Sequence, residues 1–129
     1  MSQNDGLQKA RIVAAAALDK VAQDPICLDV RALVSFADAF LVLSGRSDRH
    51  VRSIADAVSE AAARDGDRTL GVEGYDEGRW VLVDLGDLIV HVFQHEVRKT
   101  YDLERLWSDA PVVDLGLDAA AKSAGTSVR

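Results

Sequence analysis

Three ionisable side chains and two large aromatic side chains occupy one short stretch of the sequence, residues 80–94. Glycine and aspartate at positions 86–87 predict a tight hairpin turn of type II′ or I′, because glycine readily adopts the positive φ that such turns need. Counting outward from the turn fixes which residues face one another across the two strands. One face then carries the pairs Trp80 with Phe93, Leu82 with His91, and Asp84 with Ile89. A face that combines an acid, an imidazole and large aromatic rings indicates a surface that binds a partner.

The opposite face of the same hairpin is aliphatic and predicts a core. Its pairs are Val81 with Val92, Val83 with Val90, and Leu85 with Leu88. A structural interpretation of the mixed face is also open: a following helix could cover Trp80 and Phe93, since aromatic pairs serve interiors as well as interfaces. Asp84 and His91 favour binding, because an ionisable side chain under a helix must find a partner or be desolvated.

The histidines and the cysteine are not spaced as metal ligands. A strand end separates His91 from His95, Cys27 is far away in the sequence, and no CxxC or HExxH spacing occurs. We therefore expect neither a metal site nor a cofactor. No residue set supplies the nucleophile and base that covalent catalysis requires, so no catalytic residue is predicted.

Composition and charge narrow the class of protein. The 129 residues are 48% hydrophobic, enough for one globular domain with a buried core. A formal charge of −6 opposes broad contact with a nucleic-acid backbone and favours a basic protein surface or a small ligand. A single cysteine leaves no internal disulfide. Neither a signal-peptide pattern nor a membrane-length apolar run is present, so a soluble, cytoplasmic protein is expected.

Hydrophobic periodicity and turn residues predict alternating helices and strands. The first half should contain a helix over residues 7–21 that Pro25 ends, strands over 26–30 and 39–44, and a helix that Ser47 or Asp48 caps. That helix should stop near residues 65–66, before a short strand over 69–72, the hairpin, and a helix from His95. This order favours an α/β (α+β) fold: a mixed β-sheet of about five strands with two helices on one face and a C-terminal helix.

The C-terminal part of the chain carries two further patterns. Leu103 and Trp107 are four residues apart, so they should share a helix side that packs against the sheet. Glu104 would then face outward, either as a solvated charge or as a docking residue. Residues 1–108 are expected to form the domain, and 109–129 a largely disordered extension in which Val112 and Val113 could still pack.

An ordered series of short motifs runs through the chain: FADAFLV at 36–42, SGRSDRHV at 44–51, EG at 73–74, WVLVD at 80–84, VHVF at 90–93, EVR at 96–98 and YDLERLW at 101–107. This series resembles the ribosomal silencing factor family, RsfS, also called Iojap-like. The whole series is far more specific than any single motif. The chain departs from the family at two positions, with Ala39 where tyrosine is usual and His50 where glutamine is usual.

The resemblance implies a nucleotidyltransferase-like topology and a non-enzymatic function. Such proteins bind the fourteenth protein of the large ribosomal subunit, block joining of the small subunit and repress translation when nutrients are scarce. An acidic chain with an aromatic and acidic face suits a basic ribosomal partner. The predicted partner-binding residues are Trp80, Leu82, Asp84, Ile89, His91, Phe93, Glu96, Arg98, Tyr101, Asp102 and Glu104. A basic patch of Arg46, Arg49 and Arg52 could add a contact with ribosomal RNA at the rim, or be a solvated helix start.

Two alternatives stay open. One is a nucleotidyltransferase-like enzyme, which needs a Gly-Ser turn for phosphate and an Asp-x-Asp pair that holds two metal ions. Here the Asp-x-Asp spacing at residues 65–67 falls in a loop, and Asp84 and Asp87 are separated by a turn, so catalysis is not expected. The other is a homodimer that covers an exposed apolar patch of Trp80, Leu82, Ile89 and Phe93.

Overall fold

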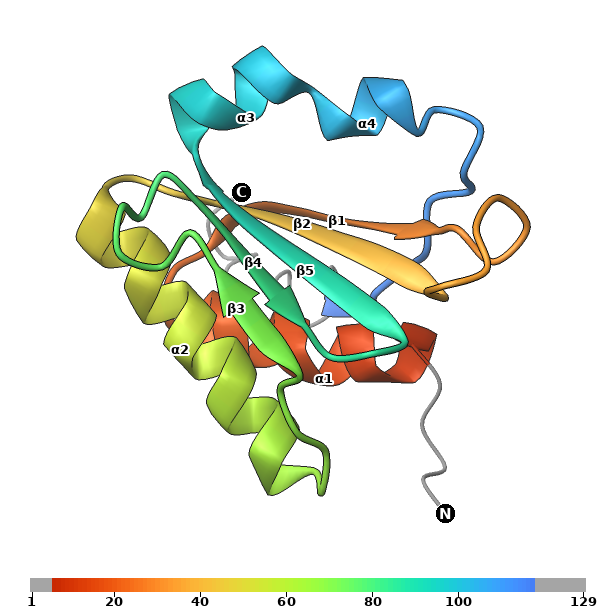
Figure 1. The fold of residues 1–129 in the computed structure, drawn as a ribbon, viewed down its shortest axis with the longest axis horizontal. Helices are drawn as coiled ribbons and strands as arrows, with labels where there is room; N and C mark the ends of the chain where they lie inside the picture. Colours follow the sequence, from red (N-terminus) through yellow and green to blue (C-terminus); the bar gives the residue numbers. More distant parts are fainter. Residues whose placement is uncertain (1–5, 118–129) are drawn as a thin grey trace, which may run out of the picture.

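The computed structural model describes residues 6–117, which form a five-stranded mixed sheet with helices on both faces (Figure 1). The elements are α1 (Gly6–Asp19), β1 (Gln23–Asp29), β2 (Ala39–Gly45), α2 (Asp48–Arg64), β3 (Gly71–Glu73), β4 (Trp80–Asp84), β5 (Leu88–Gln94), α3 (His95–Tyr101) and α4 (Leu103–Leu106). The strands lie in the order β1-β2-β5-β4-β3, with β2 and β5 parallel and the other neighbours antiparallel. The predicted fold class is confirmed.

The hairpin of β4 and β5 has the predicted register. Its mixed face pairs Trp80 with Phe93, Leu82 with His91, and Asp84 with Ile89. The turn closes with a 2.9 Å hydrogen bond from the Leu85 N–H to the Leu88 carbonyl oxygen. Gly86 has a φ of +89°, a conformation that a residue with a Cβ adopts at a cost. The turn chemistry therefore decides which residues share each face.

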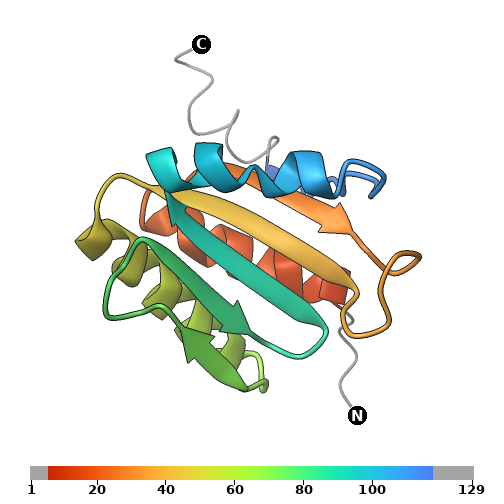
Figure 2. The same cartoon turned by 45° about the horizontal axis from the view of Figure 1, so that its top comes forward.

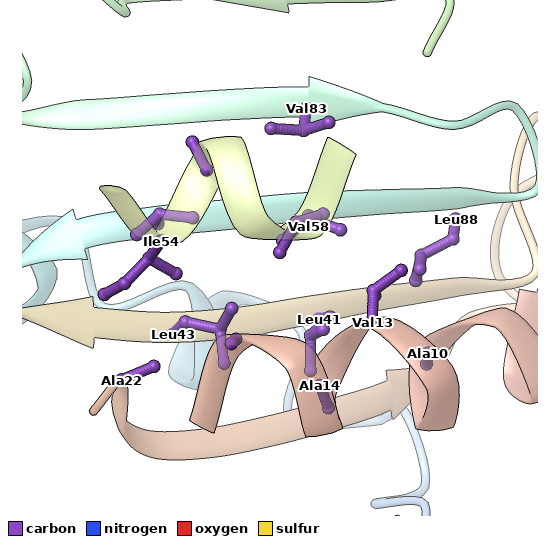
Figure 3. Close-up of a cluster of buried hydrophobic side chains, with 14 of the residues drawn as sticks. Ala10, Val13, Ala14, Ala22, Leu41, Leu43, Ile54, Val58, Val83 and Leu88 are labelled. Atoms are coloured by element: carbon purple, nitrogen blue, oxygen red, sulfur yellow. The ribbon is translucent and has the colours of Figure 1, made fainter. Parts of the chain in front are cut away.

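The aliphatic face of the sheet is the core of the domain. α1 and α2 pack against each other and lie across this face (Figure 2). Figure 3 shows Val13 of α1 and Val58 of α2 gathered with Leu41, Val83 and Leu88 of the sheet, and all five are buried. The predicted pair of helices on the aliphatic face is thereby confirmed.

The ends of α2 follow from local residues. Ser47 is the N-cap, and its hydroxyl oxygen accepts a 3.1 Å hydrogen bond from the His50 N–H. After Arg64 the chain turns at Gly66, which has a φ of +83°. Both ends were predicted from the sequence, and Ser47 rather than Asp48 provides the cap.

α1 ends earlier than predicted. It stops at Asp19, and Pro25 lies within β1. The Ala22 N–H donates a 3.1 Å hydrogen bond to the Ala17 carbonyl oxygen, and Val21 takes a left-handed φ of +63°. This hydrogen bond closes the helix and turns the chain into the sheet. Pro25 is tolerated in β1 because β1 is an edge strand.

The C-terminal extension is structured at its beginning. Two hydrogen bonds of 2.8 Å pair it with β1, from the Asp29 N–H to the Pro111 carbonyl oxygen and from the Val113 N–H to the Cys27 carbonyl oxygen. Residues 111–113 thus show the packing that the sequence left open for Val112 and Val113, because the edge strand β1 offers backbone groups with which they pair. Residues 118–129 lie outside the described part of the chain.

Candidate partner-docking face

The mixed face of the hairpin is partly covered. Phe93 is fully buried, and Ile89 and His91 are buried as well. α3 and α4 lie over this side of the sheet (Figure 2), and Val97 and Leu103 pack into the same cluster as Phe93. The expected exposed apolar patch is therefore wrong for Ile89 and Phe93, since the helical segment that follows the hairpin covers them.

The helical segment is broken at Asp102, which has a φ of +49° and separates α3 from α4. Leu103 is buried and Trp107 packs over the sheet, as predicted, with its ring edge-to-face against Phe40 at 5.1 Å. Tyr101 also meets the sheet, through Trp80. Six residues span roughly 240° around a continuous helix, so an unbroken helix would not bring the rings at 101 and 107 to one side.

A row of rings runs along this side, and we call it the aromatic face: Phe36, Phe40, His91, Trp80 and Tyr101. Phe40 and His91, in the middle of the row, are buried. Ring centroids are 4.6 Å apart for Trp80 and Tyr101 and 6.3 Å for Phe36 and Phe40. The ends of the row are the most accessible, with Phe36 63% and Tyr101 50% exposed. Trp80 is half-buried between them. The aromatic face thus offers ring surface to a partner without opening the core.

Phe36 is absent from the predicted partner-binding residues. It lies in the loop between β1 and β2 and reaches the row through Phe40. Phe36 precedes the buried strand, so the alternation of residues along that strand does not include it. The sequence pattern therefore does not predict on which side of the sheet Phe36 lies. An aromatic residue in a connecting loop is the signal that could have identified it.

His91 lies under the middle of the aromatic face and has a specific partner. The Trp80 Nε1–H donates a 3.2 Å hydrogen bond to the His91 Nδ1. Burial lowers the pKa of His91 to about 4, so the ring is neutral near pH 7. The imidazole is therefore a polar but uncharged group among aromatic rings.

Asp84 supports the hairpin turn. Its Oδ1 accepts a 2.8 Å hydrogen bond from the Gly86 N–H, and the side chain is half-buried. Asp84 and His91 lie on the same side of the hairpin as predicted, yet each has its own partner. Leu82, also half-buried, lies opposite His91 and packs against the cluster that contains Phe40.

Arg98 and Glu104 brace α3 against α4. The Arg98 Nη2 and Nε donate to the Glu104 Oε2 at 2.8 and 3.1 Å, and Nη1 donates to the Ser44 Oγ at 2.7 Å. The Arg98 side chain is 11% exposed. The prediction that Glu104 simply faces outward is wrong, because the buried guanidinium draws its carboxylate inward.

Two other predicted acids are more accessible. Glu96 is exposed in the first turn of α3, and Asp102 is half-buried at the break between the helices. Both lie close in sequence to Tyr101, at the end of the aromatic face. Asp102, which directly follows Tyr101, places a carboxylate next to the end of the aromatic face.

The basic patch lies at the start of α2, which packs on the opposite side of the sheet. Arg46 and Arg49 are exposed. Arg52 is held by a 3.1 Å hydrogen bond to the Asp76 carbonyl oxygen. His50 accepts from the Arg46 N–H through Nδ1 and bonds the Lys20 carbonyl oxygen through Nε2. His50 therefore ties the α1 end to the α2 start.

The carboxylates considered for metal chemistry have other partners. The Lys9 Nζ lies 2.7 Å from the Asp67 Oδ2 and 3.6 Å from the Asp87 Oδ2. Within residues 6–117 no group of three or more His, Cys, Asp or Glu could hold a metal ion. Burial raises the pKa of the Cys27 thiol to about 12. The described helices include none long and apolar enough to cross a membrane.

Comparison with known proteins identifies the family. A family model described as "Ribosomal silencing factor during starvation" matches residues 3–128. The ribosomal silencing factor RsfS of Bacillus subtilis is 48% identical over 105 residues, 81% of this chain and 89% of that protein. A mouse protein named mitochondrial assembly of ribosomal large subunit protein 1 is 30% identical over 90 residues, 67% of this chain and 40% of that protein. A crystal structure of a Chromobacterium violaceum protein superposes with a TM-score of 0.79 at 35% identity, covering 81% of this chain and 88% of that one. The chain thus belongs to the ribosomal silencing factor family, RsfS.

Proposed function

We propose that this protein binds the large ribosomal subunit through its fourteenth ribosomal protein, blocks association with the small subunit and represses translation under nutrient limitation. Family membership supports a silencing role, and the name of the mouse relative associates that protein with the large subunit. The proposed mechanism is occupancy of a surface in the cytoplasm, with no catalytic step.

The observation that carries this proposal is the aromatic face with acids at its end. Trp80 and Tyr101 are partly exposed and in ring contact at 4.6 Å. Tryptophan and tyrosine are the residue types that most often dominate protein interfaces, because they bury a large area at a small entropy cost. Asp102 directly follows Tyr101, and Glu96 is exposed on the same helix, in a chain of net charge −6. A basic ribosomal protein matches both features.

The predicted partner-binding residues divide into two roles under this proposal. Trp80, Leu82, Glu96, Tyr101 and Asp102 have accessible side chains that can meet the partner directly. The others support the face from within or at its edge: Asp84, Ile89, Phe93, Arg98 and Glu104. The buried His91 has both roles open to it, because it accepts from Trp80 through Nδ1 and keeps its other ring nitrogen unpaired. Contact of the exposed Arg46 and Arg49 with ribosomal RNA at the rim is a further part of the proposal.

Sedimentation with purified large ribosomal subunits tests the binding. We expect near-stoichiometric pelleting that weakens as salt rises, because part of the attraction is between opposite charges. Adding small subunits after the protein should leave them unjoined, with inhibition proportional to the occupied large subunits. Absence from the pellet at moderate salt, or inhibition by trace amounts of protein, would contradict the proposal.

A homodimer of the free protein is the second candidate. The favouring observation is the exposure of Phe36 and Tyr101 at the two ends of one ring row, with Leu106 of α4 also exposed. A twofold pairing that covers these rings would compete with ribosome binding. Light scattering over a concentration series tests it: a constant mass near 13.9 kDa would reject the dimer.

A further inference from the structure

We propose that His91 is the polar specificity determinant of the aromatic face: its Nε2–H donates a hydrogen bond to a carbonyl oxygen of the protein that docks there. This assignment rests on the proposed function and deepens it, because it names the atom and the chemistry of one contact. The rings around His91 supply contact area, whereas a hydrogen-bond donor supplies direction and position.

The position of the ring proton follows from Trp80. An indole N–H can donate but cannot accept, so the 3.2 Å contact requires the His91 Nδ1 to be an acceptor. A neutral imidazole with an unprotonated Nδ1 carries its proton on Nε2. Burial favours the neutral ring. The hydrogen bond inside the hairpin therefore fixes the ring proton on the other nitrogen, Nε2.

The donor on Nε2 is free and reachable. Within the described residues, His91 forms one hydrogen bond, through Nδ1, and no ion pair; its other contacts are with aromatic rings. The buried polar atoms that lack a partner in that part of the chain are the Asp67 Oδ2 and the Glu104 Oε1, so the His91 Nε2 is not sealed from solvent. The residue as a whole is 7% exposed. An unpaired donor with so little solvent contact can be satisfied by one acceptor of a protein that docks on the aromatic face.

The surroundings select the chemistry of that acceptor. Phe40 presents its edge at 5.6 Å from the His91 ring, and Phe93 stacks at 6.2 Å. Apolar surroundings of this kind penalise a buried carboxylate, which would lose its hydration without gaining a charged partner. A neutral carbonyl oxygen costs less to desolvate and matches a neutral donor. Because its N–H is already bonded to His91, Trp80 meets the partner through its ring alone.

Three variants of His91 separate the two nitrogens. His91→Asn keeps an acceptor near the Nδ1 position for Trp80 but has no donor at Nε2. His91→Gln reaches the Nε2 position with its amide but offers Trp80 no acceptor. His91→Phe keeps a ring and neither polar group. The measurement is the Kd for purified large ribosomal subunits by sedimentation. We expect His91→Gln within about threefold of the unmodified chain, and His91→Asn and His91→Phe weaker by about tenfold, the value of one hydrogen bond.

The opposite ranking would overturn the assignment. If His91→Asn binds fully and His91→Gln is weakened, the ring acts by positioning Trp80 and not by meeting the partner. Tyr75→Phe is the control, since it removes a hydrogen bond to Asp56 of α2, on the other side of the sheet. Its affinity should equal that of the unmodified chain, and melting temperatures must show that each variant is folded.

A second measurement needs no ribosome. Nitrogen-15 spectra of the imidazole in the free protein should report a neutral ring protonated at Nε2. A ring protonated at Nδ1 would overturn the assignment even if the chain binds large subunits. Failure of the unmodified chain to sediment, with the Nε2–H tautomer present, would instead reject the proposed function.

Discussion

The two sides of the central sheet bury different kinds of side chain. On the side of α1 and α2 the buried side chains are apolar throughout, among them Leu41, Val83 and Leu88. On the other side, apolar packing is interrupted by hydrogen-bonded polar groups, with His91 bonded to Trp80 and Arg98 bonded to Glu104. The first side specifies shape by packing, whereas the second side fixes the orientation of individual groups. A face that must present certain groups to a partner needs the second kind of order.

Introducing a carboxylate on one side of the sheet or the other should give the largest difference in the free energy of unfolding. Val83→Asp buries an unpaired carboxylate in the aliphatic core and should reduce the free energy of unfolding by about 4 kcal/mol or more, measured by urea denaturation. Leu82→Asp changes the neighbouring residue of β4, whose side chain is half-buried on the other side. Leu82→Asp should reduce the free energy of unfolding clearly less than Val83→Asp does. Equal losses would mean that the two sides do not differ as described.

Acid should weaken the second side through His91. Its pKa is lowered from 6.5 to about 4 by burial, so the unfolded chain binds this proton first as pH falls. Stability from the neutral ring is fully present above pH 6.5 and is lost between pH 6.5 and 4, by about 3 kcal/mol in all. Denaturation at several pH values measures it against His91→Phe, which should lack this part of the pH dependence. If the free energy of unfolding of both proteins changes equally with pH, the assignment of this pH dependence to His91 is contradicted.

Removing aromatic rings one at a time should distinguish residues that bind the partner from residues that stabilise the fold. Trp80→Ala removes half-buried ring surface and should weaken large-subunit binding by about 2 kcal/mol while the chain stays folded. Phe93→Ala empties a fully buried site on the same side and should instead lower the free energy of unfolding by about 3 kcal/mol. Sedimentation and urea denaturation of both variants give the two quantities. A folded Trp80→Ala protein with unchanged affinity would remove Trp80 from the interface.

The brace between α3 and α4 should give the smallest effect. Glu104→Gln weakens two charge-assisted hydrogen bonds from Arg98 and should cost about 1 kcal/mol of stability in urea denaturation. Glu96→Gln removes the same charge from an exposed position of α3 and should leave stability nearly unchanged. If Glu96→Gln costs as much as Glu104→Gln, loss of charge and not of the brace explains the effect.

The sequence by itself determined the features that depend on neighbouring residues. The turn at Gly86 set the hairpin register, the period of two along β4 and β5 separated the aliphatic face from the mixed one, and Ser47 and Gly66 bounded α2. Each of these depends on backbone conformations and spacings within a few residues. The ordered motifs likewise indicated the family without any knowledge of the fold.

Tertiary structure decided which of the predicted side chains remain accessible. Burial of Phe93, the brace of Arg98 and Glu104, and the inclusion of Phe36 in the ring row each join residues from different elements. The break at Asp102 sets how the helical segment crosses the sheet, and local spacing could not predict it. Likewise, pairing of residues 111–113 with β1 depends on a free strand edge, which exists only once the sheet has formed. Accessibility is a property of the assembled surface, whereas register and periodicity are already present in the chain.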